Sequence, residues 1–381
     1  MPDDDPGWSG LTRQRLSRLA AAIAVVLVAG FIYVKPTLPL PAAAISRSTV
    51  PTMAGPFSAT FDFLTPALGW ALVVDYSAYN TRFWVFRTDD GAAHWDRQYF
   101  GKAVGDRTYL HFFDARNGFA YVGRSYRTTD GGAHWLILNL PKSFSYVTFA
   151  SPTDGWAEAF AGGAERLFRT TDAGLTWTRL EVVPAGSAVL QPLTEAQASP
   201  FRAGGEGWLG ADHQAVPTLF VTRDGGSSWQ TLELTSAGAG YSTSSFATTV
   251  RLLPDGNVVT FVRDENARLL GAYLTPDGGA TWRLLSFPAI VGVADNISFL
   301  DSEHWWMFHA GSIYRTDDAG GSWLYVKASG LPDGWTFAGA RAIDQRHAWW
   351  TLTSSESSIL TALALTFDGG AHWSVVSVPM P

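Results

Sequence analysis

The sequence contains no cysteine among its 381 residues. This absence excludes disulfide bonds, thiolate zinc sites and cysteine nucleophiles, but it leaves the cellular compartment open. Charged residues are also scarce, at 16%, and acidic residues outnumber basic ones, which gives a formal net charge of −7. A basic surface for nucleic acid is therefore not expected, and we predict no nucleic-acid partner.

Apolar and turn-forming residues are abundant instead. Hydrophobic residues make up 46% of the chain, which is enough for a large core and excludes global disorder. The 17 tryptophans, 38 glycines and 20 prolines are typical of packed β-sheets joined by many tight turns.

One long apolar run lies near the N-terminus. Residues 19–34 carry no charge, and three arginines precede them. At about 1.5 Å per residue in a helix the run spans roughly 24 Å, slightly less than the hydrocarbon core of a bilayer. The sequence predicts a cytoplasmic tail over 1–18, a single transmembrane helix over 19–34, a proline-rich linker over 35–56, and the remaining chain on the extracytoplasmic side of the membrane.

A cleaved signal peptide is the alternative for this segment. Ala42, Ala43 and Ala44 have the small side chains of a cleavage site, although they lie well beyond the apolar run. Both interpretations export the rest of the chain.

An octet recurs seven times: Thr, any residue, Asp, any, small, any, variable, Trp. The seven tryptophans are 40 to 53 residues apart. Repeats of this period indicate one supersecondary unit per copy. The invariant residues are Thr88, Asp90 and Trp95; Thr128, Asp130 and Trp135; Thr170, Asp172 and Trp177; Thr222, Asp224 and Trp229; Thr275, Asp277 and Trp282; Thr316, Asp318 and Trp323; and Thr366, Asp368 and Trp373.

The residue types of the octet favour a hairpin turn. The Asp carboxylate and the Thr hydroxyl can bond nearby backbone N–H groups, and Gly at the fifth position adopts conformations that a side chain resists. Ala92 replaces that Gly in the first copy, so we expect strain there. His94, His134 and His372 occupy the seventh position, where other copies have Thr or Ser, and are interpreted as turn residues.

A second pattern precedes each octet: an apolar strand, a short polar turn, and in four copies a Gly-aromatic pair such as Gly69-Trp70 or Gly118-Phe119. The pair is degenerate in the sixth and seventh copies, and the fifth keeps only the turn and the apolar strand. Each unit then resolves into four short strands. The sequence therefore predicts an all-β fold, a seven-bladed β-propeller with four-stranded antiparallel blades over 57–381. An open solenoid is the alternative, but seven units without obvious caps favour a ring closed by packing rather than by an exchanged strand.

The octet is identified as the Asp-box, or BNR, repeat. With the Gly-aromatic hairpins, residues 57–381 resemble the seven-bladed propellers of the photosystem II stability and assembly factor family. Sortilin-type receptors, sialidases and xyloglucan-cleaving glycosidases carry similar repeats. The family resemblance implies an assembly role, and it implies that the octets lie at the blade periphery, away from the ligand.

No constellation of catalytic, cofactor-binding or metal-binding residues is evident, and we predict none. The Arg-Ile-Pro motif of sialidases is absent, and the GxGxxG match at 205–210 lies in a β-rich repeat rather than between a strand and a helix. Glycoside hydrolysis, the enzymatic alternative, would need a carboxylate pair. Acids outside the octets that could supply it are Asp75, Asp106, Glu165, Asp212, Asp264 and Glu265. For Trp305-Trp306 and Trp349-Trp350 we expect one ring of each pair in the core.

The loops after the second and fourth strands of each blade lie opposite the octets. They are rich in arginine and tyrosine, which suit an acidic protein partner. The candidate partner-binding residues are Arg82, Arg107, Arg124, Arg166, Arg268, Tyr76 and Tyr109. Further cations and tyrosines nearby are Lys102, Arg263, Tyr79 and Tyr126. The preferred hypothesis is a membrane-tethered scaffold or assembly factor that binds another extracytoplasmic or membrane protein, or an acidic segment of one; a glycan-binding or glycan-cleaving propeller is the alternative.

Overall fold

A computed structural model describes most of the second of two compact units, residues 50–381. The described residues are 53, 57–77, 82–102, 108–138, 140, 144–161, 164–180, 189–190, 201–202, 205–213, 217–234, 246–263, 269–286, 297–309, 312–354 and 361–381. The predicted tail, transmembrane helix and linker, apart from Met53, lie outside them. Within the described ranges, no helix is long and apolar enough to cross a bilayer.

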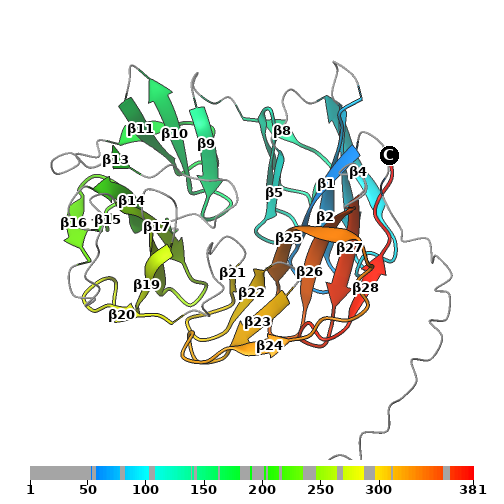
Figure 1. Ribbon diagram of the computed structural model, residues 1–381. Coiled ribbons are helices and arrows are strands. Elements are labelled where there is room, and N and C mark those ends of the chain that lie inside the picture. The colour runs from blue at the N-terminus through cyan, green and yellow to red at the C-terminus, as the bar shows by residue number, and fades with distance from the viewer. Residues whose placement is uncertain are drawn as a thin grey trace, which may run out of the picture. The chain divides into compact units, whose positions relative to one another are not determined.

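The described residues form seven blades, as predicted, with 28 antiparallel strands (Figure 1). Blades 1 to 3 contain β1 (Phe57–Phe63), β2 (Gly69–Asp75), β3 (Arg82–Thr88) and β4 (Asp96–Lys102); β5 (Thr108–Phe112), β6 (Gly118–Val122), β7 (Ser125–Thr128) and β8 (Leu136–Ile137); and β9 (Phe144–Phe149), β10 (Gly155–Ala161), β11 (Ala164–Thr170) and β12 (Thr178–Leu180). Blades 4 and 5 contain β13 (Val189–Leu190), β14 (Gly207–His213), β15 (Thr218–Thr222) and β16 (Gln230–Glu233); and β17 (Phe246–Leu252), β18 (Val258–Arg263), β19 (Leu269–Thr275) and β20 (Arg283–Leu284). Blades 6 and 7 contain β21 (Ile297–Phe299), β22 (Trp305–His309), β23 (Ser312–Thr316) and β24 (Leu324–Val326); and β25 (Trp335–Ala342), β26 (Ala348–Ser354), β27 (Thr361–Thr366) and β28 (Trp373–Val376).

Five blades are separate four-stranded sheets, but blades 4 and 5 share one sheet. Their link is the end of β14, where Asp212 and His213 pair with Ala247 and Phe246 of β17. The innermost strand of blade 4, β13, has only two residues. Each of the two blades still has four strands, as predicted, and a short backbone pairing joins them.

Hydrophobic clusters between consecutive blades hold the sheets together. Seven such clusters occur in the described part of the chain, and each draws buried residues from two neighbouring blades. The seventh joins blade 7 to blade 1, whose strands lie side by side in Figure 1, so the ring is closed and the open solenoid is excluded. An aromatic pair crosses each interface: Phe63–Trp349, Trp70–Phe112, Phe119–Phe149, Trp156–Phe201, Trp208–Trp282, Phe261–Phe299 and Phe308–Trp350.

The closure between blades 7 and 1 combines packing with a few hydrogen bonds. In the described strands neither sheet takes a strand from the other end of the chain, in line with the predicted closure by packing. Met53, however, is fully buried and pairs with Thr361 of β27 through two backbone hydrogen bonds of 2.9 and 3.1 Å. On the other side, the Ser377 hydroxyl donates to the carbonyl oxygen of Ala92 at 2.6 Å, and the Trp95 indole donates to that of Ser377.

Asp62 joins three blades at the innermost strands. Its carboxylate, almost fully buried on β1, accepts the N–H of Phe112 in blade 2 at 2.7 Å and the Arg341 guanidinium of blade 7 at 2.8 Å. The Nδ1 atom of His111 lies 3.5 Å from the same carboxylate. Burial alone would raise the pKa of Asp62, but the hydrogen bond and charge of His111, together with Arg341 and the Phe112 N–H, hold it below its ordinary value.

Each octet forms the turn between the third and fourth strands of its blade. In the first, the Thr88 hydroxyl donates to Asp90 at 2.9 Å and accepts the N–H of Ala92, while Asp90 accepts both the N–H and the ring Nδ1 of His94. The same four contacts recur in all seven octets. The three seventh-position histidines therefore act as turn residues.

Two consecutive left-handed residues follow the aspartate in every octet. Gly91 has a φ of 71° and Ala92 a φ of 69°, so the substitution of Ala for Gly in the first copy is accommodated in a conformation that L-residues disfavour. In six of the seven octets, the N–H of the first of these residues bonds the earlier turn of the same blade, as Gly91 does to the Ala67 carbonyl at 2.9 Å. This bond links the octet to the hairpin that precedes it.

The deepest indoles belong to that hairpin rather than to the octet. The fully buried tryptophans are Trp70, Trp156, Trp208, Trp305, Trp306 and Trp350. Of the octet tryptophans only Trp373 is buried, and the other six are half-exposed against the inter-blade clusters.

Acid should destabilise the fold through the octet aspartates. Their hydrogen bonds lower the pKa of Asp90, Asp130, Asp172, Asp224, Asp277 and Asp368 to about 2. A carboxylate in the unfolded chain titrates near 3.9, so this stabilisation is complete above about pH 4 and is lost as the pH falls through about 2. The melting temperature should accordingly fall steeply between about pH 4 and 2, as measured by circular dichroism.

The sixth octet offers a matched pair of substitutions to test whether the octet aspartates cause the acid sensitivity. The Ser322 N–H and the Thr316 and Ser322 hydroxyls lower the pKa of Asp318, whereas Asp317 is exposed at the variable second position. Asp318→Asn should lower the melting temperature at neutral pH by a few degrees and flatten its dependence on acid, and Asp317→Asn should change neither. Equal effects of the two would contradict the assignment.

Asp62→Ala should destabilise the propeller by about 2 kcal/mol, because it leaves the buried Phe112 N–H without an acceptor and removes the partner of Arg341. Ser298→Ala is the control, since the Ser298 hydroxyl accepts the Ala342 N–H between blades 6 and 7 without any charge. Ser298→Ala should lower the free energy of unfolding by about 1 kcal/mol or less. Denaturant unfolding of both variants measures the difference, and an Asp62→Ala variant as stable as the parent would refute the role.

Candidate protein-binding surfaces

The antiparallel blades present two different ends. The turns after the first and third strands, which include every octet, form one end, here called the octet face. The loops after the second and fourth strands form the other, here called the loop face. The hydrogen bond between Gly91 and Ala67 ties two octet-face turns together. On the loop face, the residues that the structure describes are mostly the strand ends.

Arg82 and Asp75 form an ion pair on the loop face of blade 1. Their side chains meet at 2.7 Å, and Arg82 is half exposed while Asp75 is buried. Asp75 also accepts the N–H of Ser77 at 2.8 Å, and the bonds from Ser77 and Arg82 lower its pKa. The guanidinium lies over the Trp84 ring at 5.6 Å. Arg82 thus reaches solvent with its charge balanced by a fixed carboxylate.

Tyr76 and Arg124 are the other exposed candidates on this face. Tyr76 follows β2 and is 39% exposed. Arg124 is exposed in the β6–β7 turn, where its carbonyl accepts the N–H of Val122. Arg166 is half-buried on β11, opposite Ala159. Arg107 and Arg268 lie outside the described residues, as do Asp106, Asp264, Glu265 and Tyr79.

Two of the loop-side tyrosines serve packing. Tyr109 is half-buried in the cluster between blades 2 and 3, with its ring 6.1 Å from that of Phe119. Tyr126 is buried against Phe83 and donates to the Lys102 carbonyl at 3.3 Å; burial raises its pKa. Both tyrosines lie at the end of a strand beside a loop. At such a position, a tyrosine that binds a partner and one that packs in the core have the same sequence pattern.

The tryptophan pairs considered for sugar stacking are buried and do not reach the surface. Trp305, Trp306, Trp349 and Trp350 are all at most 8% exposed, so both rings of each pair, not one, lie in the core. Residues 207–210 of the GxGxxG match belong to β14, so no strand-to-helix phosphate loop exists there. Within the described ranges, no three His or acidic side chains gather as a metal site would require.

Arginine clamps, which the sequence analysis missed, connect neighbouring blades on the octet face. Arg87, immediately before the first octet, lies 5.5 Å over the Trp70 ring, and Trp70 donates to the Gly131 carbonyl in the octet of blade 2 at 2.8 Å. A Cβ built on Gly131 would lie only 2.8 Å from the Arg87 guanidinium. The clamp therefore requires glycine at the fourth position of the next octet.

Two further arginines repeat this arrangement. Arg169 lies over Trp156 and fills the space beside Gly225, and Arg315 lies over Trp306 and beside Gly369. A Cβ on either glycine would fall within 2.3 Å of the guanidinium. The signal that could have revealed the clamps is an Arg directly before the octet Thr, together with a Trp in the same blade and a Gly in the next octet.

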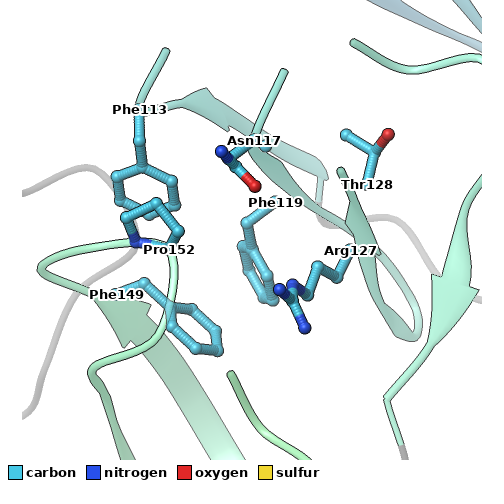
Figure 2. Close-up of a pocket in the computed structure, with 8 residues that line it drawn as sticks. Phe113, Asn117, Phe119, Arg127, Thr128, Phe149 and Pro152 are labelled. Carbon is cyan, nitrogen blue, oxygen red and sulfur yellow. The ribbon is translucent and has the colours of Figure 1, made fainter. Parts of the chain in front are cut away.

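Blade 2 has the arginine but not its two partners. Arg127 pairs across the strands with Phe119, which stands where the clamped blades have Trp, and the next octet has Ala173 at its fourth position. The Arg127 side chain makes no hydrogen bond, ion pair or ring contact within the described part of the chain. A shallow pocket opens at this interface, lined by Phe113, Asn117, Phe119, Arg127, Phe149 and Pro152 (Figure 2).

Comparison with known proteins supports the family resemblance. No family model matches the chain. A photosystem II assembly lipoprotein, Ycf48 of Synechococcus sp. (strain CC9902), is 30% identical over 136 residues, which is 34% of this chain and 38% of that relative. The chain thus spans well under half of the curated relative that it matches.

Solved structures agree in fold. A structure titled "YCF48 bound to D1 peptide" is 18% identical, with a TM-score of 0.51 over 83% of this chain and 96% of that one. Ycf48 from Cyanidioschyzon merolae is also 18% identical, with a TM-score of 0.45 over 70% and 84%. The predicted resemblance to the photosystem II assembly-factor propellers is confirmed, in sequence over part of the chain and in fold over most of it.

Proposed function

We propose that this chain is an assembly factor: a propeller that binds a protein partner and is held at the extracytoplasmic side of a membrane by its N-terminal helix. The observation that carries the proposal is the sequence match to a photosystem II assembly lipoprotein, on a chain with the same propeller fold. One Ycf48 structure is described as bound to a D1 peptide, which supports a peptide segment of a protein as the class of partner.

The loop face supplies groups suited to such a partner. Tyr76, Arg82 and Arg124 are exposed there. Arginine donates to carboxylates through a planar fork, and tyrosine offers apolar area with a polar tip, so an acidic segment fits both. The glycan alternative has no matching observation, since the paired tryptophans are buried.

Charge reversal on this face should weaken partner binding. Arg124→Glu should reduce several-fold the amount of partner crosslinked to the chain in intact membranes of its host, because an acidic segment would meet a like charge. Arg283→Glu, an exposed site on the outer strand β20, makes the same charge change elsewhere and should leave crosslinking unchanged. Quantitative mass spectrometry gives both yields. If the chain retained a glycan and no protein was crosslinked to it, the proposed protein-binding function would be wrong.

The tether is tested separately. The run over 19–34 has no charge and follows three arginines, so the chain should remain in the membrane fraction after washing with alkaline carbonate. A variant with Val25→Arg and Val26→Arg should be released, because two charges at the bilayer centre are costly. Release of the unmodified chain would refute the anchor without affecting the partner-binding proposal.

A further inference from the structure

The blade 2–blade 3 interface differs from the clamped interfaces in two residues that both act on one arginine. Phe119 lacks the indole over which Arg87, Arg169 and Arg315 lie in their own blades. Ala173, 1% exposed, stands at the fourth position of the next octet, where the clamped interfaces have a glycine beside the guanidinium.

Arg127 is consequently displaced from the clamp. The Arg127 side chain is half-buried, and it makes no hydrogen bond, ion pair or ring contact within the described part of the chain. An arginine at such a site normally lies near an acceptor, because its five N–H groups lose water on burial. The cation therefore remains available to a carboxylate from outside the chain.

The adjoining pocket adds an apolar wall. Phe113, Phe149 and Pro152 line it beside the Arg127 side chain, and Figure 2 shows the rings and the guanidinium around one opening. The pocket is shallow, so it suits the tip of an aliphatic side chain rather than an aromatic ring. An apolar recess next to an unpaired cation is complementary to an aliphatic residue adjacent to an acidic one.

We propose that the pocket between Phe119, Phe149 and Pro152, with Arg127 at its edge, is a second docking site on the octet face, for a peptide segment in which a small aliphatic residue adjoins Asp or Glu. The aliphatic tip packs on Phe149 and Pro152, and the neighbouring carboxylate accepts hydrogen bonds from Arg127. The site lies at the opposite end of the blades from the proposed loop-face surface, so either can fail without the other.

The probe is N-acetyl-Val-Asp-amide, and N-acetyl-Val-Asn-amide is its uncharged counterpart. Saturation-transfer NMR with the purified full chain in detergent should show the acidic peptide binding about tenfold more tightly than the amide, and Arg127→Gln should remove that preference. Arg283→Gln removes the same charge from the exposed outer strand β20 and should leave the preference intact. Equal affinity of the two peptides, or equal loss in both variants, would overturn the proposal.

Ala173→Gly separates docking from general loss of structure. Without the methyl group, Arg127 can take the clamp position beside blade 3, so the acidic peptide should bind about tenfold more weakly although the arginine is still present. The melting temperature should rise, because Ala173 has a φ of 64° and glycine adopts that conformation freely. Unchanged peptide affinity in a well-folded Ala173→Gly variant would refute the site.

Discussion

The carboxylate of one aspartate in each octet stabilises a turn that the rest of the blade requires. It accepts the N–H and side chain of the seventh residue, as Asp90 does from His94, and so holds two left-handed residues in place. The first of these residues then bonds the earlier turn of the blade. Both turns are thereby fixed relative to each other, and the large ring of the Gly-aromatic pair is oriented into the next interface.

This dependence makes the octet face the rigid end of the propeller. Its octet aspartates are bonded within their own turns, and the clamps of Arg87, Arg169 and Arg315 connect three of the blades to the blade that follows. An interface where the clamp is missing leaves its arginine available for other contacts. At the junction after blade 2, a missing clamp coincides with a pocket.

The fold could be predicted because its signal is local and repeated. Thr, Asp and Trp at fixed spacing specify the turn, and seven copies specify the number of blades. The merging of blades 4 and 5 was not predictable, since it depends on Asp212 and His213 pairing with β17, a contact between segments far apart in the chain. Tyr126 shows a similar limit, because an aromatic residue beside a loop has the same pattern whether it faces solvent or, as here, Phe83.

The candidate site was harder to predict for the same physical reason. Arg127 has an ordinary sequence context, immediately before an octet. Phe119 lies opposite it in its own blade, and Ala173 stands at the position of the following octet where the clamped interfaces have glycine, so the exception involves residues from two blades. A comparison of corresponding positions across the seven copies, rather than of each motif alone, would have revealed the exception.

The seam between blades 7 and 1 has a mechanical consequence. Met53 and Val378 belong to the same hydrophobic cluster, so both ends of the described propeller enter the ring at one interface. A pulling force applied to the chain from both sides would load that interface directly, whereas the other six are backed by continuous chain. Under tension the ring should open at this junction first, with the two hydrogen bonds of Met53 among the earliest to break.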